Sequence, residues 1–207
     1  MFFDLRNASL AKPGILNAIV VPRPIAWVSS SSLTGDINLA PFSYFSLLSS
    51  SPPTVMFSCV NPTDRREKDT LRNIRDSKEY VINLVSKASL ESMHLTSTPT
   101  PYGTNEFDIA DLRSAPSENV IAPRVEGTPA ALECTLHKLV TIDPERENDL
   151  GCTVVIGRII GLYIAPHLLD EHGHFRSIEA GLMARLGGNL YSELGQITEL
   201  ASVAHKD

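Results

Sequence analysis

The sequence has no long hydrophobic run and only three cysteines, and both shortages exclude classes of protein. No apolar stretch approaches the roughly 18 residues of a membrane-spanning helix, so we expect no membrane association. The first residues lack a basic segment followed by an apolar one, so the expected location is the cytoplasm. Cys59, Cys134 and Cys152 show no C-x-x-C spacing and lie in apolar runs, which favours buried reduced thiols over a disulfide or a metal role.

Basic residues and the common catalytic motifs are also scarce. Eighteen Lys and Arg face 24 Asp and Glu, for a net charge of −6, and the basic residues are scattered, which argues against a nucleic-acid surface. The G-x-S-x-G, H-E-x-x-H, Walker A and glycine-rich dinucleotide patterns are absent. The histidines of segment 167–174 include a His-Gly-His turn, which fixes ligands too poorly to predict a metal site.

What the sequence does contain is a β-rich segment over residues 23–58. Its short apolar runs, 25–28 and 55–57, are separated by a Thr-Gly-Asp turn at 34–36 and by prolines that cannot donate to a sheet, which is typical of barrel or sandwich strands. Small hydroxyl residues are frequent along these strands, so a flat ligand can lie against them. At 207 residues, 43% of them hydrophobic, the chain is interpreted as one domain, residues 1–207.

The remaining chain predicts helices and strands around this segment. The expected elements are a short helix or hairpin arm at 8–21, a helix beginning near 68–70, a strand at 80–85, a helix at 89–95, and a hairpin of two long strands at 130–142 and 152–164. Leu90, Met93 and His94 are expected on the inner face of the helix at 89–95. Residues 96–127 predict a long loop with one helical turn at 106–112, a kind of segment that tends to cover something. Gly187-Gly188 indicates a sharp turn.

Lys68, Asp69 and Thr70 form the first candidate site, at a predicted helix start. Backbone amides at a helix N-terminus, together with a lysine and a threonine hydroxyl, suit a phosphate or another anion. The residues alone also allow a charged helix cap formed by Asp69 or Thr70 with Lys68 in solvent, and they favour this alternative.

The segment 38–43 forms the second candidate site. Pro41 removes an amide from the ladder, and Ala40 and Ser43 leave room for backbone groups to face the edge of a heteroaromatic ring. A bulged edge strand is the plainer explanation. Trp27, the only tryptophan, belongs either to the core, which its size favours, or to a ring-stacking site.

The ordered set of these motifs resembles the flavin reductase-like, FMN-binding split-barrel family. That family includes flavoredoxins and the reductase components of two-component monooxygenases. The segments that carry the resemblance are 22–29, Gly35, 38–45, Pro52-Pro53, Ser58, 68–70, 73–74, 80–83 and 185–188. The resemblance implies a mainly β fold with flanking helices, a six-stranded antiparallel split β-barrel of Greek-key type, working as a homodimer with one FMN per subunit.

The resemblance also implies roles for individual residues. Lys68, Asp69 and Thr70 would hold the phosphate region of FMN. The ribityl chain and phosphate would be served by Ser29, Ser30, Ser31 and Ser58, and the isoalloxazine would be lined by Asn38, Ala40, Pro41 and Ser43. Trp27 becomes a neighbour of the flavin, and no residue is expected to act as nucleophile or general base, because the flavin itself carries the redox chemistry.

The function implied by the resemblance is an NAD(P)H-dependent flavin reductase, with NADH or NADPH as donor. An FMN-containing electron carrier reduced by a protein partner is the alternative, and a monooxygenase or another electron-transfer protein is a possible partner. A structural or regulatory protein that has lost its cofactor is disfavoured by the intact motifs around Lys68 and Asn38. The histidine-bearing segments and the loop 96–127 are the candidates for the nicotinamide site.

Overall fold

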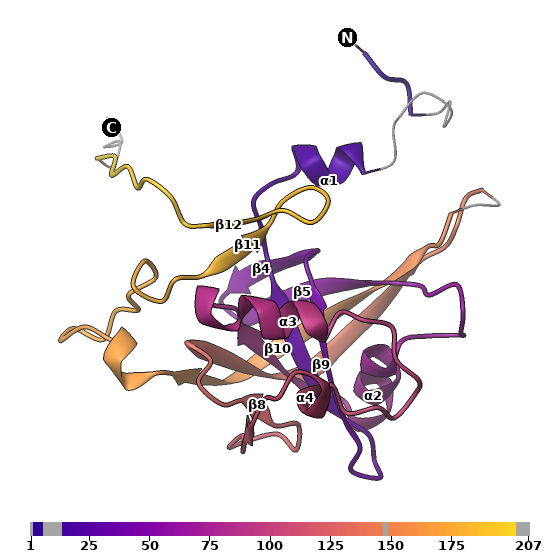
Figure 1. Cartoon of the computed structure of the whole chain (residues 1–207), viewed down its shortest axis with the longest axis horizontal. Helices are drawn as coiled ribbons and strands as arrows, with labels where there is room; N and C mark the ends of the chain where they lie inside the picture. The colour runs from indigo at the N-terminus through magenta and orange to yellow at the C-terminus, as the bar shows by residue number, and fades with distance from the viewer. Residues whose placement is uncertain (1, 6–13, 147–148, 202–207) are drawn as a thin grey trace.

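A computed structural model of the chain describes residues 2–5, 14–146 and 149–201. Its centre is one antiparallel sheet, with helices along its side (Figure 1). In spatial order the strands are β3 (Ile37–Phe42), β2 (Ala26–Ser31), β6 (Glu79–Leu84), β9 (Ala130–Ile142), β10 (Cys152–Ile164), β5 (Pro53–Val60) and β4 (Phe45–Ser50). The predicted mainly β fold with flanking helices is confirmed, although this sheet has seven strands where six were expected.

The sheet curls around its own core, as a barrel does. The rings of Phe42 on β3 and Phe57 on β5 lie 4.8 Å apart, although these strands are far apart in the hydrogen-bonded order. Both rings belong to a buried cluster that also includes Val28, Ile74 and Tyr80. Strands from both halves of the sheet therefore share one apolar interior.

The hairpin of β9 and β10 has the bounds that the sequence predicts, because long alternation of apolar and polar residues over 130–142 and 152–164 is a strong strand signal. Cys59 and Cys134 are buried and reduced, as expected, and burial raises their pKa values to about 11 and about 12. Cys152, at the start of β10, is also a free thiol but only half-buried.

Helix α2 (Asp69–Ser77) begins directly after Lys68 and carries Leu71 and Ile74 into the core, as predicted. The 3₁₀ turn η2 (Lys87–Ser89) and helix α3 (Leu90–Leu95) confirm the next predicted helix, but the placement of His94 on its inner face was wrong. His94 is exposed beside Tyr191, while Met93 and Thr96, three residues apart, point inward. The i, i+3 spacing of this short helix selects Thr96 instead of His94.

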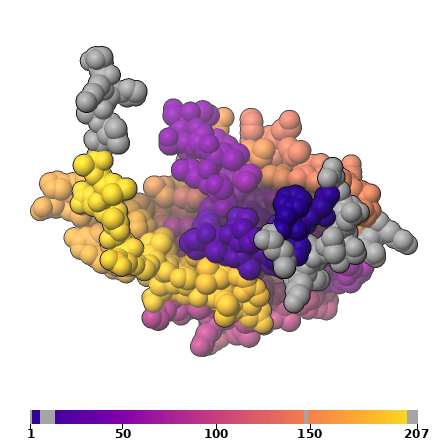
Figure 2. Space-filling model, turned by 90° about the horizontal axis from the view of Figure 1, so that it is seen from above, coloured from indigo at the N-terminus to yellow at the C-terminus, as the bar shows by residue number. Residues whose placement is uncertain are grey.

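Helix α1 (Ile15–Ile19) and the segment 183–193, one near each end of the described chain, pack together on one face. This helix and the yellow C-terminal segment lie side by side in Figure 2. The buried guanidinium of Arg23 joins them, because it donates to the carbonyls of Val20 and Leu186. Around it, β1 (Arg23–Pro24), β11 (Met183–Arg185) and β12 (Tyr191–Glu193) form a small sheet, with the predicted glycine turn between β11 and β12. Of the helix or arm predicted over 8–21, residues 8–13 lie outside the described residues.

The loop 96–127 contains the predicted helical turn, α4 (Glu106–Ile109), and the short strands β7 (Ser114–Ala115) and β8 (Arg124–Val125). It covers a second buried cluster that includes Trp27, Leu39, Met93, Phe107 and Val125. A further 3₁₀ turn, η3 (Pro166–Leu168), follows β10. Among the described residues, no helix is long and apolar enough to cross a membrane.

Candidate functional site

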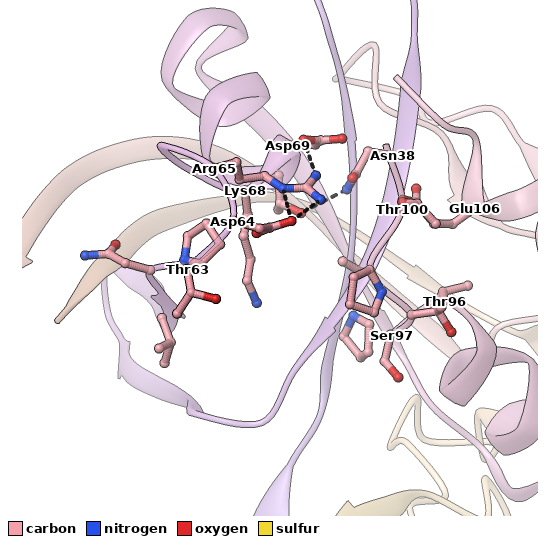
Figure 3. A pocket seen from close by; sticks show the side chains of 18 of the residues that line it. Asn38, Thr63, Asp64, Arg65, Lys68, Asp69, Thr96, Ser97, Thr100 and Glu106 are labelled. Carbon is pink, nitrogen blue, oxygen red and sulfur yellow. Dashed lines mark hydrogen bonds and ion pairs between the residues drawn. The ribbon is translucent and has the colours of Figure 1, made fainter. Parts of the chain in front are cut away.

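A cavity of about 490 Å³ lies between β3, the start of α2 and the first residues of the loop 96–127 (Figure 3). Its walls come from five separate segments of the chain. They are Asn38, Ala40 and Pro41 on β3, residues 60–65 from the end of β5 onward, residues 68–70 at the start of α2, residues 96–100 with Glu106, and Leu150 between β9 and β10. This volume is typical of small-molecule sites in proteins.

Asn38 and Thr70 hold the two sides of the cavity together. The Nδ2 of Asn38 donates a hydrogen bond of 2.9 Å to Oγ1 of Thr70, and both side chains are buried. This bond joins the edge strand β3 to the first turn of α2. The sequence motifs around Asn38 and Thr70, 32 residues apart, therefore form one site.

Lys68 is the cation of this site. Its side chain extends into the cavity in Figure 3, and its Nζ lies 5.5 Å from the centre of the Phe42 ring. Lys68 is also the N-cap of α2, where it makes no side-chain capping bond, and it forms no ion pair with any described residue. An uncapped helix start beside an unpaired ammonium group favours an anion.

Arg65 lies above the same wall and is already paired. Its guanidinium is 2.9 Å from Asp64 and 3.7 Å from Asp69. Burial raises the pKa of Asp69, although the amide of Gly103 and the charge of Arg65 oppose the shift. The positive charge of Arg65 is therefore partly neutralised, and Lys68 contributes the available charge.

Glu106 joins the covering loop to the strand beneath it. Its Oε2 accepts from the backbone amide of Leu39 at 2.9 Å, and its Oε1 accepts from the hydroxyl of Thr100 at 3.0 Å. Burial raises the pKa of this carboxyl, against the lowering effect of the Leu39 amide. The carboxyl thus satisfies the free edge of β3 and holds the cavity wall at Thr100.

The structure brings half of the sequence-predicted site residues to this cavity. Those that line it are Asn38, Ala40, Pro41, Lys68, Asp69 and Thr70. Those that do not line it are Trp27, Ser29, Ser30, Ser31, Ser43 and Ser58. Trp27 contacts the cavity wall from the core side, because its Nε1 donates to Oγ1 of Thr96, which does line the cavity.

The serines of β2 lie inside the fold. The hydroxyl of Ser29 donates to the carbonyl of Pro123 and accepts from Asn83, and that of Ser30 accepts from Asn73 on α2. Ser31 is also buried. Their expected contacts with a ribityl chain stay predictions, while their internal bonds hold β2 against α2, β6 and the loop.

Ser43 and Ser58 lie beside the cavity and not in its wall. Ser58 is two residues before Val60 on β5, so the two side chains leave the same face of the strand, and Val60 lines the cavity. Ser43 follows β3, and the neighbouring carbonyl of Tyr44 accepts from the amide of Ser58. Both serines are half-buried, next to one another in the fold.

Several lining residues were not predicted individually. The Thr-Ser-Pro-rich composition of 96–100 suggested a covering loop, but which of its residues face the cavity depends on the Trp27–Thr96 and Glu106–Thr100 bonds. Glu106 gave no signal in the sequence, because a helix-start glutamate is ordinarily exposed. No histidine in the described part of the chain lines the cavity. His172 and His174 lie in an exposed turn, where their backbone amides donate to Asp170, and His167 is exposed on η3.

Residues 18–179 match the model of the flavin reductase like domain family. The chain belongs to this family. A relative from Aquifex aeolicus, described as an uncharacterized protein, is 36% identical over 173 residues, which are 84% of this chain and 85% of the relative. The residues matched by the family model, 18–179, include every segment that lines the cavity.

Two solved structures of other proteins are similar to this chain. Nitrilotriacetate monooxygenase component B from Bacillus cereus is 27% identical, with a TM-score of 0.87 over 97% of this chain and 99% of that chain. A protein with a split barrel domain from Shewanella frigidimarina NCIMB 400 is 18% identical, with a TM-score of 0.82 over 98% and 100% of the two chains. The second likeness identifies the fold of this family member as a split barrel.

Proposed function

We propose that this protein is a flavin reductase that binds FMN in the cavity between β3, α2 and the loop 96–106, with NADH or NADPH as hydride donor. The observation that carries the proposal is the unpaired Lys68 at the uncapped start of α2, beside a cavity lined by small residues of β3. An anion site next to a slot for a flat ring fits the two ends of FMN. Membership of the flavin reductase like domain family supports the same ligand.

In this proposal, the residues of the chain bind and orient the cofactor. Lys68, the hydroxyl of Thr70 and the first amides of α2 hold the phosphate. Asn38, Ala40 and Pro41 line the ring, and Glu106 keeps the adjacent edge of β3 satisfied. When bound, the flavin supplies the redox chemistry, because its ring accepts a hydride from a nicotinamide. The protein therefore contributes position and electrostatics and needs no nucleophile of its own.

The test is the visible spectrum of the purified protein with FMN, before and after anaerobic addition of NADH or NADPH. Flavin absorption that bleaches with one of the two donors supports the reductase and names its donor. Absorption that persists with both donors contradicts the reductase and favours the carrier fed by a protein partner. A protein that binds no added FMN contradicts both.

The proposed reductase works as a homodimer. Strand β4 ends the sheet with Leu47 and Leu48 exposed, and α1, on the same face in Figure 2, exposes Leu16 and Ile19. Tyr44 links the two, because its hydroxyl donates to Asn17 at 2.6 Å. Exposed apolar side chains on two linked elements suit contact with a second copy of the chain. The mass in solution should be twice 22.6 kDa, and an FMN-bound monomer would contradict the dimer.

The fold similarity to component B of nitrilotriacetate monooxygenase supports a monooxygenase as the partner that receives the reduced flavin. The proposed location is the cytoplasm, where reduced nicotinamides are supplied by metabolism. Turnover of NAD(P)H with free FMN, and not only with tightly bound FMN, would show that the reduced flavin leaves the protein, as delivery to such a partner requires.

A further inference from the structure

A second cavity, of about 440 Å³, lies on the other side of Arg65 and Asp69, which line both cavities. We call it the α2 groove. It is formed by the turn before α2, the exposed side of that helix and the ring of Tyr102, and it contains Arg65, Arg66, Arg72 and Arg75. It therefore adjoins the proposed FMN site at its phosphate end, with Arg65 and Asp69 between the two cavities.

The α2 groove holds two guanidinium groups that carboxylates leave unpaired. Arg75 pairs with Glu67 at 2.6 Å, and Arg65 pairs with Asp64 and Asp69. Arg66 and Arg72 form no ion pair among the described residues, and both are exposed. The groove is lined by these four arginines and by three carboxylates, Glu67, Asp69 and Asp76, so the lining carries one excess positive charge on a chain of net charge −6.

Tyr102 adds an aromatic face to this positive charge. The guanidinium of Arg72 lies 4.3 Å from the centre of the Tyr102 ring, which is 48% exposed. A stacked arginine and tyrosine present planar surfaces to which a purine base can add, and free guanidinium groups bind phosphate through paired N–H donors. The groove thus offers both parts of a nucleotide site, a phosphate end and a base platform.

We infer that the α2 groove binds the adenosine-phosphate half of a dinucleotide whose redox-active ring occupies the neighbouring cavity. Arg66 and Arg72 hold phosphate, and the Arg72–Tyr102 pair stacks on the base. The inference rests on the proposed function, because it places the ring in the proposed flavin site. Two dinucleotides carry this chemistry, FAD and the nicotinamide donor.

The test is isothermal titration calorimetry of the full chain with FMN, FAD, NAD⁺ and NADP⁺, comparing wild type with the double variant Arg66→Ala/Arg72→Ala. Because each lost charge-assisted contact weakens binding, the affinity for at least one adenosine-bearing ligand should fall about tenfold or more. The affinity for FMN should change by less than about twofold, a margin below the effect of one such contact. Arg176→Ala, an exposed arginine far along the chain, is the matched control and should change neither.

The ligand whose affinity falls identifies which dinucleotide binds in the groove. A loss confined to FAD assigns the groove to the adenylate of the flavin, and a loss for NADP⁺ but not NAD⁺ assigns it to the additional phosphate of the donor. Equal losses of affinity for FMN and every other ligand, or no loss for any, would overturn the inference without contradicting FMN binding by the wild-type protein. A wild-type protein that binds no flavin would instead contradict the proposed function.

Tyr102 provides a second, independent readout. Tyr102→Ala removes the stacking surface and should weaken the same adenosine-bearing ligand, while Tyr102→Phe keeps the ring and should bind as wild type does. Equal affinity in all three proteins would show that no base stacks there. Thermal unfolding of each variant checks that the fold is intact, as expected for exposed side chains.

Discussion

The indole Nε1 of Trp27 donates a hydrogen bond of 2.9 Å to Oγ1 of Thr96, across 69 residues of sequence. Trp27 is fully buried in the cluster beneath the loop 96–127, and Thr96 lines the cavity. The hydroxyl of Thr96 in turn donates to the carbonyl of Met93 at 2.8 Å. The cavity wall at residue 96 is therefore fixed by the core, so changes in this bond should affect both stability and the site.

Replacement of Thr96 by valine should destabilise the protein by about 1–3 kcal/mol, because it leaves the buried indole N–H without an acceptor. Thr96→Ser keeps the hydroxyl and is the matched control, with a much smaller loss. Urea unfolding of the three proteins measures the difference. If valine and serine cost the same, the Trp27 bond does not stabilise the fold.

The Glu106 carboxyl should make stability depend on pH in a defined direction. Its pKa in the folded protein is raised above the ordinary value of 4.5, so the folded state favours the neutral form. Its contribution is complete below about pH 4.5 and is lost as the pH rises through the raised pKa. Glu106→Gln keeps an acceptor for the Leu39 amide but does not ionise, so the stability of wild type relative to this variant should fall over that range.

Urea unfolding of wild type and Glu106→Gln at a series of pH values measures this difference. It includes the coupling of Glu106 to the charge of Asp69, which also raises the pKa of Glu106. A constant difference, or one that grows in favour of wild type with rising pH, would contradict the assignment. Glu106→Ala is the harsher change, because it leaves the Leu39 amide unsatisfied, and should cost about 1–3 kcal/mol at any pH.

Gly157 on β10 has no room for a side chain. A Cβ there would lie 2.8 Å from Cζ of Tyr80, closer still to its hydroxyl, and 3.3 Å from the carbonyl of Thr135. Gly157→Ala should therefore destabilise the fold by about 1–3 kcal/mol through overpacking. Gly195→Ala, where a Cβ meets nothing within 4 Å, is the control.

The pair Gly157→Ala and Tyr80→Phe should be non-additive, because removal of the hydroxyl relieves part of the overlap. A double-mutant cycle by urea unfolding measures the coupling. Strict additivity would show that the Gly157 backbone adjusts without involving Tyr80.

Local sequence patterns predicted the long strands and the start of helix α2. The alternation in 130–142 and 152–164 predicted β9 and β10 with their observed bounds, and the charged turn before Lys68 predicted the start of α2. The small sheet of β1, β11 and β12 was not predicted, because strands of two or three residues carry no periodic signal. It depends on the pairing of Arg23 with Arg185, which only the folded chain brings together.

The residues of the candidate site were likewise predicted only in part. The motifs around Asn38 and Lys68 were recognised in the sequence, and their meeting is explained by the Asn38–Thr70 bond. The serines of β2 were assigned to the ligand from the motif alone, whereas the hydroxyls of Ser29 and Ser30 are used within the fold. A row of four serines does not reveal which face each occupies, since that depends on the pairing of β2 with β3 and β6.

The most direct test of the account is an equilibrium titration of wild type, Lys68→Ala and the exposed control Lys138→Ala with FMN and with riboflavin, which lacks the phosphate. Wild type should bind FMN more tightly than riboflavin. Lys68→Ala should weaken FMN binding by about 1–3 kcal/mol and leave riboflavin binding unchanged, while Lys138→Ala should bind both flavins as wild type does. Equal affinity of wild type for the two flavins, with no effect of Lys68→Ala, would show that the phosphate does not bind at the start of α2.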